Sequence, residues 1–286
     1  MTEESTYLLG IARRLGNDFA ALPGVCAVMV TGSVALGESD RYSDIDMTAY
    51  YHELPPEEQL HVIRMKNRGS ERLWVLGDRN DDGFAESYIV DGVHVQVGHI
   101  TLDAWEQQMV VVLEQFDPAT PLHKALSGTL DCLPLYGHEL IAQWKERAAM
   151  YPDGLARAVV EKHLAFFPLW YLERYLEPRD AVLWTYQSLV EAAQNILGVL
   201  AGLNRVYYTT FQFKRMRKFV ASLRYVPVGL AERIEMLFAG DIHTAVLTLE
   251  ELVRDTVALV QQHMPEVDTT KAVRRIGERQ EQWTPV

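Results

Sequence analysis

The spacing of apolar residues changes near Thr101, and this change constrains the fold more than any other feature of the sequence. Before it, short apolar runs of strand length alternate with segments in which apolar residues recur every three or four positions. After it, nearly every segment has the helical period. The pattern predicts an α/β (α+β) domain with a mixed sheet, followed by an all-α helical bundle. Prolines and glycines interrupt the pattern between 118 and 153, and we divide the chain into domains 1–130 and 131–286.

Individual elements follow from the same periodicity. Strands are expected at 25–30, 44–50, 85–90 and 93–100, and helices at 6–22 and 55–67. Asp91-Gly92 is a favoured two-residue turn, so the last two strands should form a hairpin in which Glu86 pairs with Val97. The helical segments of the second half are expected at 155–176, 180–202, 210–223, 229–239 and 242–263.

The chain is acidic, with 27 lysines and arginines against 39 aspartates and glutamates, for a formal charge of −12. Surfaces that bind nucleic acid need clustered positive charge to displace counterions from phosphates, so a nucleic-acid partner is not expected. No run of about 18 apolar residues suggests a membrane span, and the acidic start lacks the pattern of a signal peptide. With only Cys26 and Cys132, far apart in apolar stretches, we expect a cytoplasmic protein with two buried free thiols.

The clearest chemical signal is a small polar constellation between two apolar strands. Gly32 and Ser33 follow the first strand, and Asp44 and Asp46 open the second. Gly32 has no Cβ, so its backbone can approach a phosphate closely. Ser33 offers a hydroxyl and an N–H to phosphate oxygens at the start of a short helix. Residues i and i+2 of a strand share a face, so both carboxylates should project to the same side.

The two neighbouring carboxylates indicate a metal site. Acids on one face of a strand repel each other unless a cation lies between them. Hard oxygen ligands beside a triphosphate suit magnesium, which stabilises the charge that develops on the attacking oxygen and on the leaving pyrophosphate. The sequence therefore predicts that Asp44 and Asp46 hold Mg²⁺, and that Gly32 and Ser33 bind a nucleoside triphosphate.

These residues resemble the motif of the nucleotidyltransferase superfamily related to DNA polymerase β. Its short members include the aminoglycoside and lincosamide nucleotidyltransferases and the minimal nucleotidyltransferases of toxin–antitoxin pairs. They carry a Gly-Ser pair, a spacer similar to that between Ser33 and Asp44, and an Asp-x-Asp within a strand. The match is close over 28–50 and loose to about 100. The resemblance implies a nucleotidyltransferase domain followed by a helical substrate-side domain.

The superfamily usually has a third carboxylate on a later strand, which completes the metal site or accepts a proton from the acceptor hydroxyl. Here the polar face of the strand at 93–100 carries Gln96 at that position. An amide can coordinate a metal through its oxygen, but it carries no charge and cannot act as a base. The hairpin register predicts that Glu86 points to the opposite face. His94 is the better candidate base, because imidazole titrates near neutrality, although it is equally consistent with a polar residue on a half-open strand.

The helical half offers further candidates. Tyr208 lies in an aromatic stretch that precedes a basic strip beginning at Lys214. One interpretation is that Tyr208 stacks on the base while Lys214 contacts phosphate. The other is a solvated helix face with aromatic residues in the core. The same choice between an acceptor pocket and a core applies to Trp170, Tyr171, Trp184 and Tyr186.

The resemblance implies an enzyme that transfers a nucleotidyl group from a Mg²⁺-bound nucleoside triphosphate, with ATP the expected donor, to a hydroxyl of a small molecule. An antibiotic such as an aminoglycoside is the acceptor class it suggests, and the acidic charge suits a cationic acceptor. Two alternatives stay open. The acceptor could be a protein side chain, or the protein could bind nucleotide with reduced or lost turnover, because Gln96 replaces the usual third carboxylate.

Overall fold

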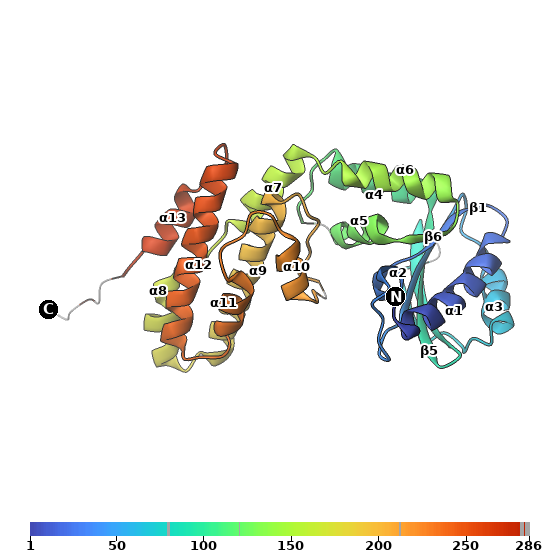
Figure 1. The fold of residues 1–286 in the computed structure, drawn as a ribbon, viewed down its shortest axis with the longest axis horizontal. Coiled ribbons are helices and arrows are strands. Elements are labelled where there is room, and N and C mark those ends of the chain that lie inside the picture. The colour runs from blue at the N-terminus through green and yellow to red at the C-terminus, as the bar shows by residue number, and fades with distance from the viewer. Residues whose placement is uncertain (79–80, 120, 212, 281–282, 284–286) are drawn as a thin grey trace. The chain divides into compact units, whose positions relative to one another are not determined.

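The computed structural model describes residues 1–286 apart from 79–80, 120, 212, 281–282 and 284–286 (Figure 1). The chain divides into two compact units. The first unit comprises Met1–Glu114 and Lys124–Met150, and the second comprises Gln115–His123 and Tyr151–Val286. The first unit thus extends past residue 130, where we divided the sequence, because a further strand and helix belong to it.

A six-stranded sheet forms the centre of the first unit, in the order β3-β4-β5-β2-β1-β6. β2 and β5 are parallel, and the other neighbouring pairs are antiparallel. The predicted fold class, a mixed sheet with helices followed by a largely helical region, is confirmed. The strands are β1 (Val25–Val30), β2 (Ile45–Tyr51), β3 (Trp74–Leu76), β4 (Gly83–Val90), β5 (Val93–Thr101) and β6 (Leu133–Tyr136).

The hairpin of β4 and β5 has the predicted register. Glu86 pairs with Val97, and Ser87 pairs with Gln96. Asp91 and Gly92 close the hairpin with φ angles of 49° and 82°, as a tight turn with two left-handed residues requires. Side chains alternate between the faces of a strand, so this register places Glu86 on the face opposite Gln96.

Two strands were not predicted, because each lacks the apolar alternation that identifies a strand. β3 is exposed along its whole length and pairs only with β4 among the described strands. β6 contains Pro134, which cannot donate to a sheet and is tolerated because β6 lies at the sheet edge beside β1. Both strands depend on a neighbouring strand rather than on their own sequence.

Helices cover both faces of the sheet (Figure 1). The apolar stripe of α1, which includes Leu8, Leu15 and Phe19, packs into one core cluster with residues of β1, β2 and β5. On the other face, Tyr50 packs against Trp105 and Trp144. The helices of this unit are α1 (Glu3–Ala20), α2 (Gly32–Leu36), α3 (Glu57–Lys66), α4 (Leu102–Leu113) and α6 (His138–Ala149). A further helix, α5 (Leu122–Asp131), begins in the second unit and continues into the first.

The second unit is largely helical. The predicted helix at 242–263 forms as α12, whereas the single helix predicted at 155–176 is wrong. Its first part, α7, ends at His163, and the chain runs without helix to Pro168, which begins a short irregular helical stretch. Proline disfavours helical geometry in the residue before it, here Phe167, so a continuous helix through Pro168 is not expected. The helices are α7 (Asp153–His163), α8 (Leu169–Tyr171), α9 (Val182–Leu203), α10 (Met216–Ser222), α11 (Leu230–Met236), α12 (Ile242–His263) and α13 (Thr270–Gly277).

Two simpler expectations can be compared with the structure. Within the described ranges, no helix is long and apolar enough to cross a membrane. Cys26 and Cys132 are both free thiols; Cys132 is buried as expected, but Cys26 is only half-buried, at the start of β1.

Candidate active site

Asp44 and Asp46 lie where β2 begins, on the side of the strand that faces away from the α1 core. Ile45 and Met47, which alternate with them, have exposed fractions of 0% and 3% and belong to that core. Both aspartates are half-buried. The alternation expected from the sequence therefore holds at this point of the sheet, and the two acids remain accessible beside a rigid strand.

Gln96 of β5 lies beside the strand that carries the two acids. It is the direct neighbour of Asp46 across the parallel pair of β2 and β5. Its amide Nε2 donates a hydrogen bond to Asp44 Oδ2 at 2.5 Å. The residue at the place of the third carboxylate is thus an uncharged donor to one of the acids, which holds the Asp44 side chain in place without adding negative charge.

The turn after β1 approaches Asp46 closely. Gly32 has a φ of 64°, and a Cβ built on it would lie 2.7 Å from Asp46 Oδ2. The N–H of Thr31 donates to the backbone oxygen of Asp46 at 2.9 Å. A side chain at residue 32 would therefore meet the carboxylate as well as a left-handed backbone, and glycine avoids both.

Ser33 follows in α2 and is half-buried. Its Oγ accepts a hydrogen bond from Ser39 Oγ at 3.2 Å, and its backbone oxygen accepts from the N–H of Glu38 at 2.9 Å. These contacts hold the loop between α2 and β2 against the turn. The structure thus gathers Gly32, Asp44, Asp46 and Gln96, with Ser33 next in the chain.

The donor set determines which ion the site could hold. Carboxylate oxygens of Asp44 and Asp46 are hard ligands of the kind Mg²⁺ prefers, and the absence of a Cβ at Gly32 allows Asp46 Oδ2 to lie against the turn. No group of three His, Cys, Asp or Glu side chains that could hold a metal occurs in the described part of the chain. Asp44 and Asp46 supply two oxygen ligands of the required kind, and their role in holding Mg²⁺ remains a prediction.

His94 lies two positions before Gln96 on β5, so its side chain projects from the same face of the sheet. It is exposed and pairs with Ile89 of β4. It is therefore open to solvent on the face that carries the two acids, and its role as a base remains a prediction.

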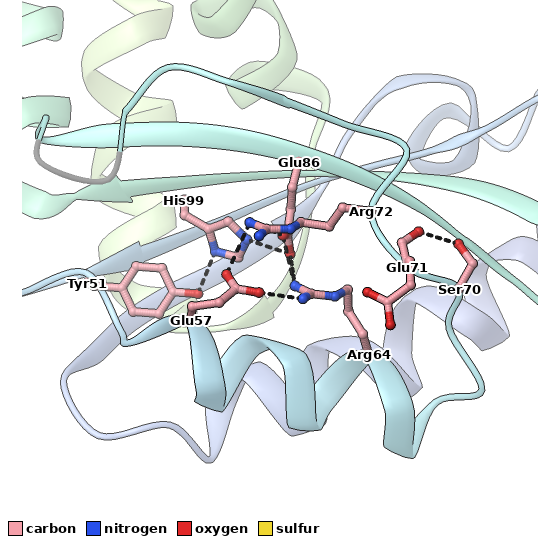
Figure 2. A network of polar contacts seen from close by, with 8 residues as sticks. All are labelled: Tyr51, Glu57, Arg64, Ser70, Glu71, Arg72, Glu86 and His99. Atoms are coloured by element: carbon pink, nitrogen blue, oxygen red, sulfur yellow. Dashed lines mark hydrogen bonds and ion pairs between the residues drawn. The ribbon is translucent and has the colours of Figure 1, made fainter.

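Glu86 occupies the opposite face, where it is fully buried in a polar network (Figure 2). Arg64 Nη1 of α3 donates to both carboxylate oxygens, at 3.1 Å and 2.9 Å. His99 Nε2 lies 3.5 Å from Glu86 Oε1. The prediction that Glu86 points away from Gln96 is confirmed, and these two partners explain how a carboxylate can be buried in the core.

Glu57 and Arg72 extend the network beyond Arg64 and Glu86 (Figure 2). Arg64 Nη2 donates to Glu57 Oε1 at 2.5 Å, and Arg72 contacts Glu57 Oε2 at 3.1 Å. Burial alone would raise the pKa of Glu86, but the neighbouring His99 imidazole and the Arg64 guanidinium outweigh it and lower that pKa. The group is therefore an internally neutralised part of the core.

The sequence pattern did not predict this network. Arg64 is 1% exposed and lies on the same buried side of α3 as Leu60 and Ile63. The signal in the sequence was Arg64 itself, which falls at a helical position that should be buried. A buried arginine requires an acid to pair with it. Glu86, within a strand of otherwise apolar and small residues, was the corresponding anion.

Lys214 and Tyr208 belong to the second unit. The Tyr208 ring is 6% exposed and packs against Phe213, Phe219 and His163. Its hydroxyl donates to the backbone oxygen of Gln194 at 3.1 Å. Tyr208 is therefore a core residue of this unit in the structure, and its predicted stacking on a base remains untested.

Lys214 is exposed just before α10. Arg217, from the same basic strip, forms ion pairs with Glu232 and Glu235 of α11. Part of the strip is thus paired with acids inside the second unit, while the phosphate-binding role of Lys214 remains a prediction.

No protein-family model matches the chain, and no curated protein matches it significantly. Among solved structures, it is similar to a nucleotidyltransferase-like protein from Exiguobacterium sibiricum 255-15, with 12% identity and a TM-score of 0.41, over 91% of this chain and 80% of that chain. Similarity at this level gives no information on activity, so functional inference rests on the residues around Asp44 and Asp46.

Proposed function

We propose that this protein is a magnesium-dependent nucleotidyltransferase that transfers a nucleoside monophosphate from a nucleoside triphosphate, with ATP the expected donor, to a hydroxyl of a small molecule. One observation carries the proposal: the Asp46 carboxylate lies against Gly32, which has no Cβ, and Gln96, the neighbour of Asp46 across β2 and β5, donates a hydrogen bond to Asp44. Two acids on one strand face, beside a turn that begins a short helix, suit a cation that carries polyphosphate.

Each residue has a task that its chemistry supports. Asp44 and Asp46 would hold Mg²⁺, which when bound offsets the charge of the triphosphate. Gly32, without a Cβ, lets the backbone of the turn lie against Asp46 Oδ2 and would let it approach a phosphate closely. The Ser33 hydroxyl, already an acceptor from Ser39, still has its own proton to donate to that phosphate.

The proposed transfer forms one bond to phosphorus and breaks another. The acceptor hydroxyl oxygen forms a bond to the α-phosphorus, and the bond from that phosphorus to the oxygen bridging to the β-phosphorus breaks. Pyrophosphate leaves with that bond's electrons, and the hydroxyl proton must go to a base. Gln96 cannot accept it, so the solvent-exposed His94 on the same sheet face is the candidate acceptor of the proton.

The acceptor is expected to be a small cationic molecule of the aminoglycoside kind. The formal charge of −12 favours approach of cations, although it does not select one of them.

A nucleotide-binding protein without turnover is the second candidate, and the hydrogen bond from Gln96 to Asp44 favours it. That bond uses one Asp44 oxygen and supplies no third negative ligand. Binding of Mg²⁺-ATP would then be retained while transfer is slow or absent.

Asp46→Ala tests the proposal. We expect the variant to lose at least about a hundredfold in affinity for Mg²⁺-ATP, because a carboxylate that binds the metal is removed from the position beside Gly32. Isothermal titration calorimetry measures the affinity, and Glu53→Ala, which removes an exposed carboxylate just after β2, is the matched control. Equal affinity in wild type and Asp46→Ala would contradict the assignment of this site.

Turnover separates the two candidates. Pyrophosphate release is measured with each nucleoside triphosphate in the presence of a panel of aminoglycosides and related aminated sugars. Release that depends on an acceptor and disappears in Asp46→Ala supports the transferase. Tight Mg²⁺-ATP binding without release with any acceptor supports the nucleotide-binding alternative.

A further inference from the structure

The second unit contains a cavity of about 330 Å³ formed by α9, the segment after α11 and the start of α12. Its floor is made of the buried residues Thr185, Leu189, Leu237 and Ala245. This volume is within the range of small-molecule sites, which are mostly apolar with a few polar groups. Apolar floors of this kind bind the apolar part of a ligand by removing it from water.

The rim of the cavity is polar on one side. Among the described residues that line the cavity, Asp180 alone carries a formal charge, and it is exposed. Its φ of 52° places it in the left-handed region just before α9. Tyr186, also on the rim, is 48% exposed. An aromatic ring and a carboxylate at the mouth of an apolar cavity suit a cation, which both groups attract.

The charges around the mouth strengthen this preference. The guanidinium of Arg179 lies 3.6 Å from the Tyr175 ring centroid and donates to the Tyr175 backbone oxygen at 2.8 Å, so it is held by a residue that does not line the cavity. Asp241, between the lining residues Gly240 and Ile242, accepts the N–H of Thr244 as the cap of α12. Two carboxylates thus belong to the segments that form the cavity mouth.

We propose that this cavity is a binding site for a small organic cation with an apolar body. The apolar body lies on Leu189, Leu237 and Ala245, and the cationic group lies at the mouth beside Asp180 and the Tyr186 ring. The site is formed within the second unit and does not depend on nucleotide or on Asp46.

Calorimetry with three probes of one shape tests the charge preference. Phenethylammonium, 2-phenylethanol and 3-phenylpropionate are titrated into the full chain without nucleotide or magnesium. We expect phenethylammonium to bind about fivefold more tightly than the alcohol, as for a partly exposed charge pair, and the carboxylate to bind most weakly. Equal affinity for all three, or no binding of the cation, would overturn the proposal.

Variants locate the binding. Asp180→Asn should lower phenethylammonium affinity about fivefold and leave 2-phenylethanol unchanged. Glu191→Gln, which removes an exposed carboxylate of α9 that does not line the cavity, is the matched control and should change neither. Ala245→Phe should abolish binding of both by filling the floor, and Ile242→Trp, at the half-buried edge, blocks the site if the first variant does not fold. An unchanged cation affinity in Asp180→Asn contradicts the assignment.

A second copy of the chain is the competing occupant, because Val182 and Leu183 beside the mouth are 53% and 87% exposed. Light scattering after size exclusion measures the mass of wild type and of Leu183→Asp. A wild-type dimer that Leu183→Asp dissociates, with phenethylammonium binding only to the dissociated variant, would assign this surface to self-association and overturn the proposal. A monomer that binds the cation supports it.

Discussion

Acidic residues on the two faces of the sheet in the first unit have opposite environments. On the face toward α3, Glu86 is fully buried between Arg64 and His99, so the protein supplies the countercharge itself. On the other face, Asp44 and Asp46 lie two positions apart and are half-buried, and the group bonded to Asp44 is the uncharged Gln96 amide. An acid neutralised inside the core contributes to folding, whereas two half-buried acids on one strand face, one of them bonded to an uncharged amide, are suited to an external cation.

Substitutions on the two faces should therefore change different properties, stability on one face and ligand affinity on the other. Changes on the Arg64 face should alter unfolding because they leave a buried charge without a partner. Changes on the Asp46 face should alter ligand affinity first, because those side chains reach solvent.

Replacing Arg64 should have the largest effect. Arg64→Met leaves Glu86 buried without its guanidinium, and we expect the free energy of unfolding to fall by about 3–5 kcal/mol. Urea denaturation measures it, with Arg13→Met, an exposed arginine of α1, as the control. In the double variant Arg64→Met/Glu86→Gln the loss should be smaller than the sum of the single losses. A stability close to wild type in Arg64→Met would mean that the network is not structural.

Acid should weaken the same face. The pKa of Glu86 is lowered in the folded protein, so its stabilising contribution is complete above the reference value of 4.5 and is lost as pH falls through the lower folded value. The urea midpoint of wild type should therefore fall more steeply than that of Glu86→Gln between neutral pH and about pH 3. Parallel pH profiles for the two proteins would contradict this assignment.

Gly32→Ala should weaken both folding and binding, by similar amounts. The left-handed φ of 64° costs about 1–2 kcal/mol of stability for alanine, and the new Cβ displaces Asp46 Oδ2, which we expect to lower Mg²⁺-ATP affinity about tenfold. Gly24→Ala is the matched control, because Gly24 has a φ of 75° and nothing within 4 Å of an added Cβ. If both variants bind Mg²⁺-ATP like wild type, the approach of Gly32 to Asp46 has no role in binding.

Gln96→Glu should have the smallest effect. A third carboxylate beside Asp44 and Asp46 should raise Mg²⁺ affinity or turnover a few-fold, about 1 kcal/mol or less, because added repulsion between the acids offsets part of the gain. Magnesium titration by calorimetry measures it. Gln107→Glu, which adds the same charge at an exposed position of α4, should leave the affinity unchanged. No change in Gln96→Glu would mean that any third ligand lies elsewhere.

Much of the first unit follows from the sequence because local patterns decide it. The strand at Val25–Val30 and the register of β4 with β5 are set by apolar runs and by the Asp91-Gly92 turn. The strand face of Asp44 and Asp46 follows from alternation alone. β6 was missed because its pairing with β1 is non-local. The helix predicted at 155–176 is wrong because the helix ends at His163 and residues 164–168, up to Pro168, are not helical.

The sequence by itself determined the order of strands and helices along most of the first unit, and which residues of β2 and β5 share a face, because side-chain periodicity is a local property of the backbone. Only the tertiary structure decided which acids have internal partners. Arg64 meets Glu86, and Gln96 meets Asp44, across pairs of elements separated by many residues. Their meeting depends on the packing of α3 on the sheet and on the parallel alignment of β2 with β5, neither of which short-range spacing encodes.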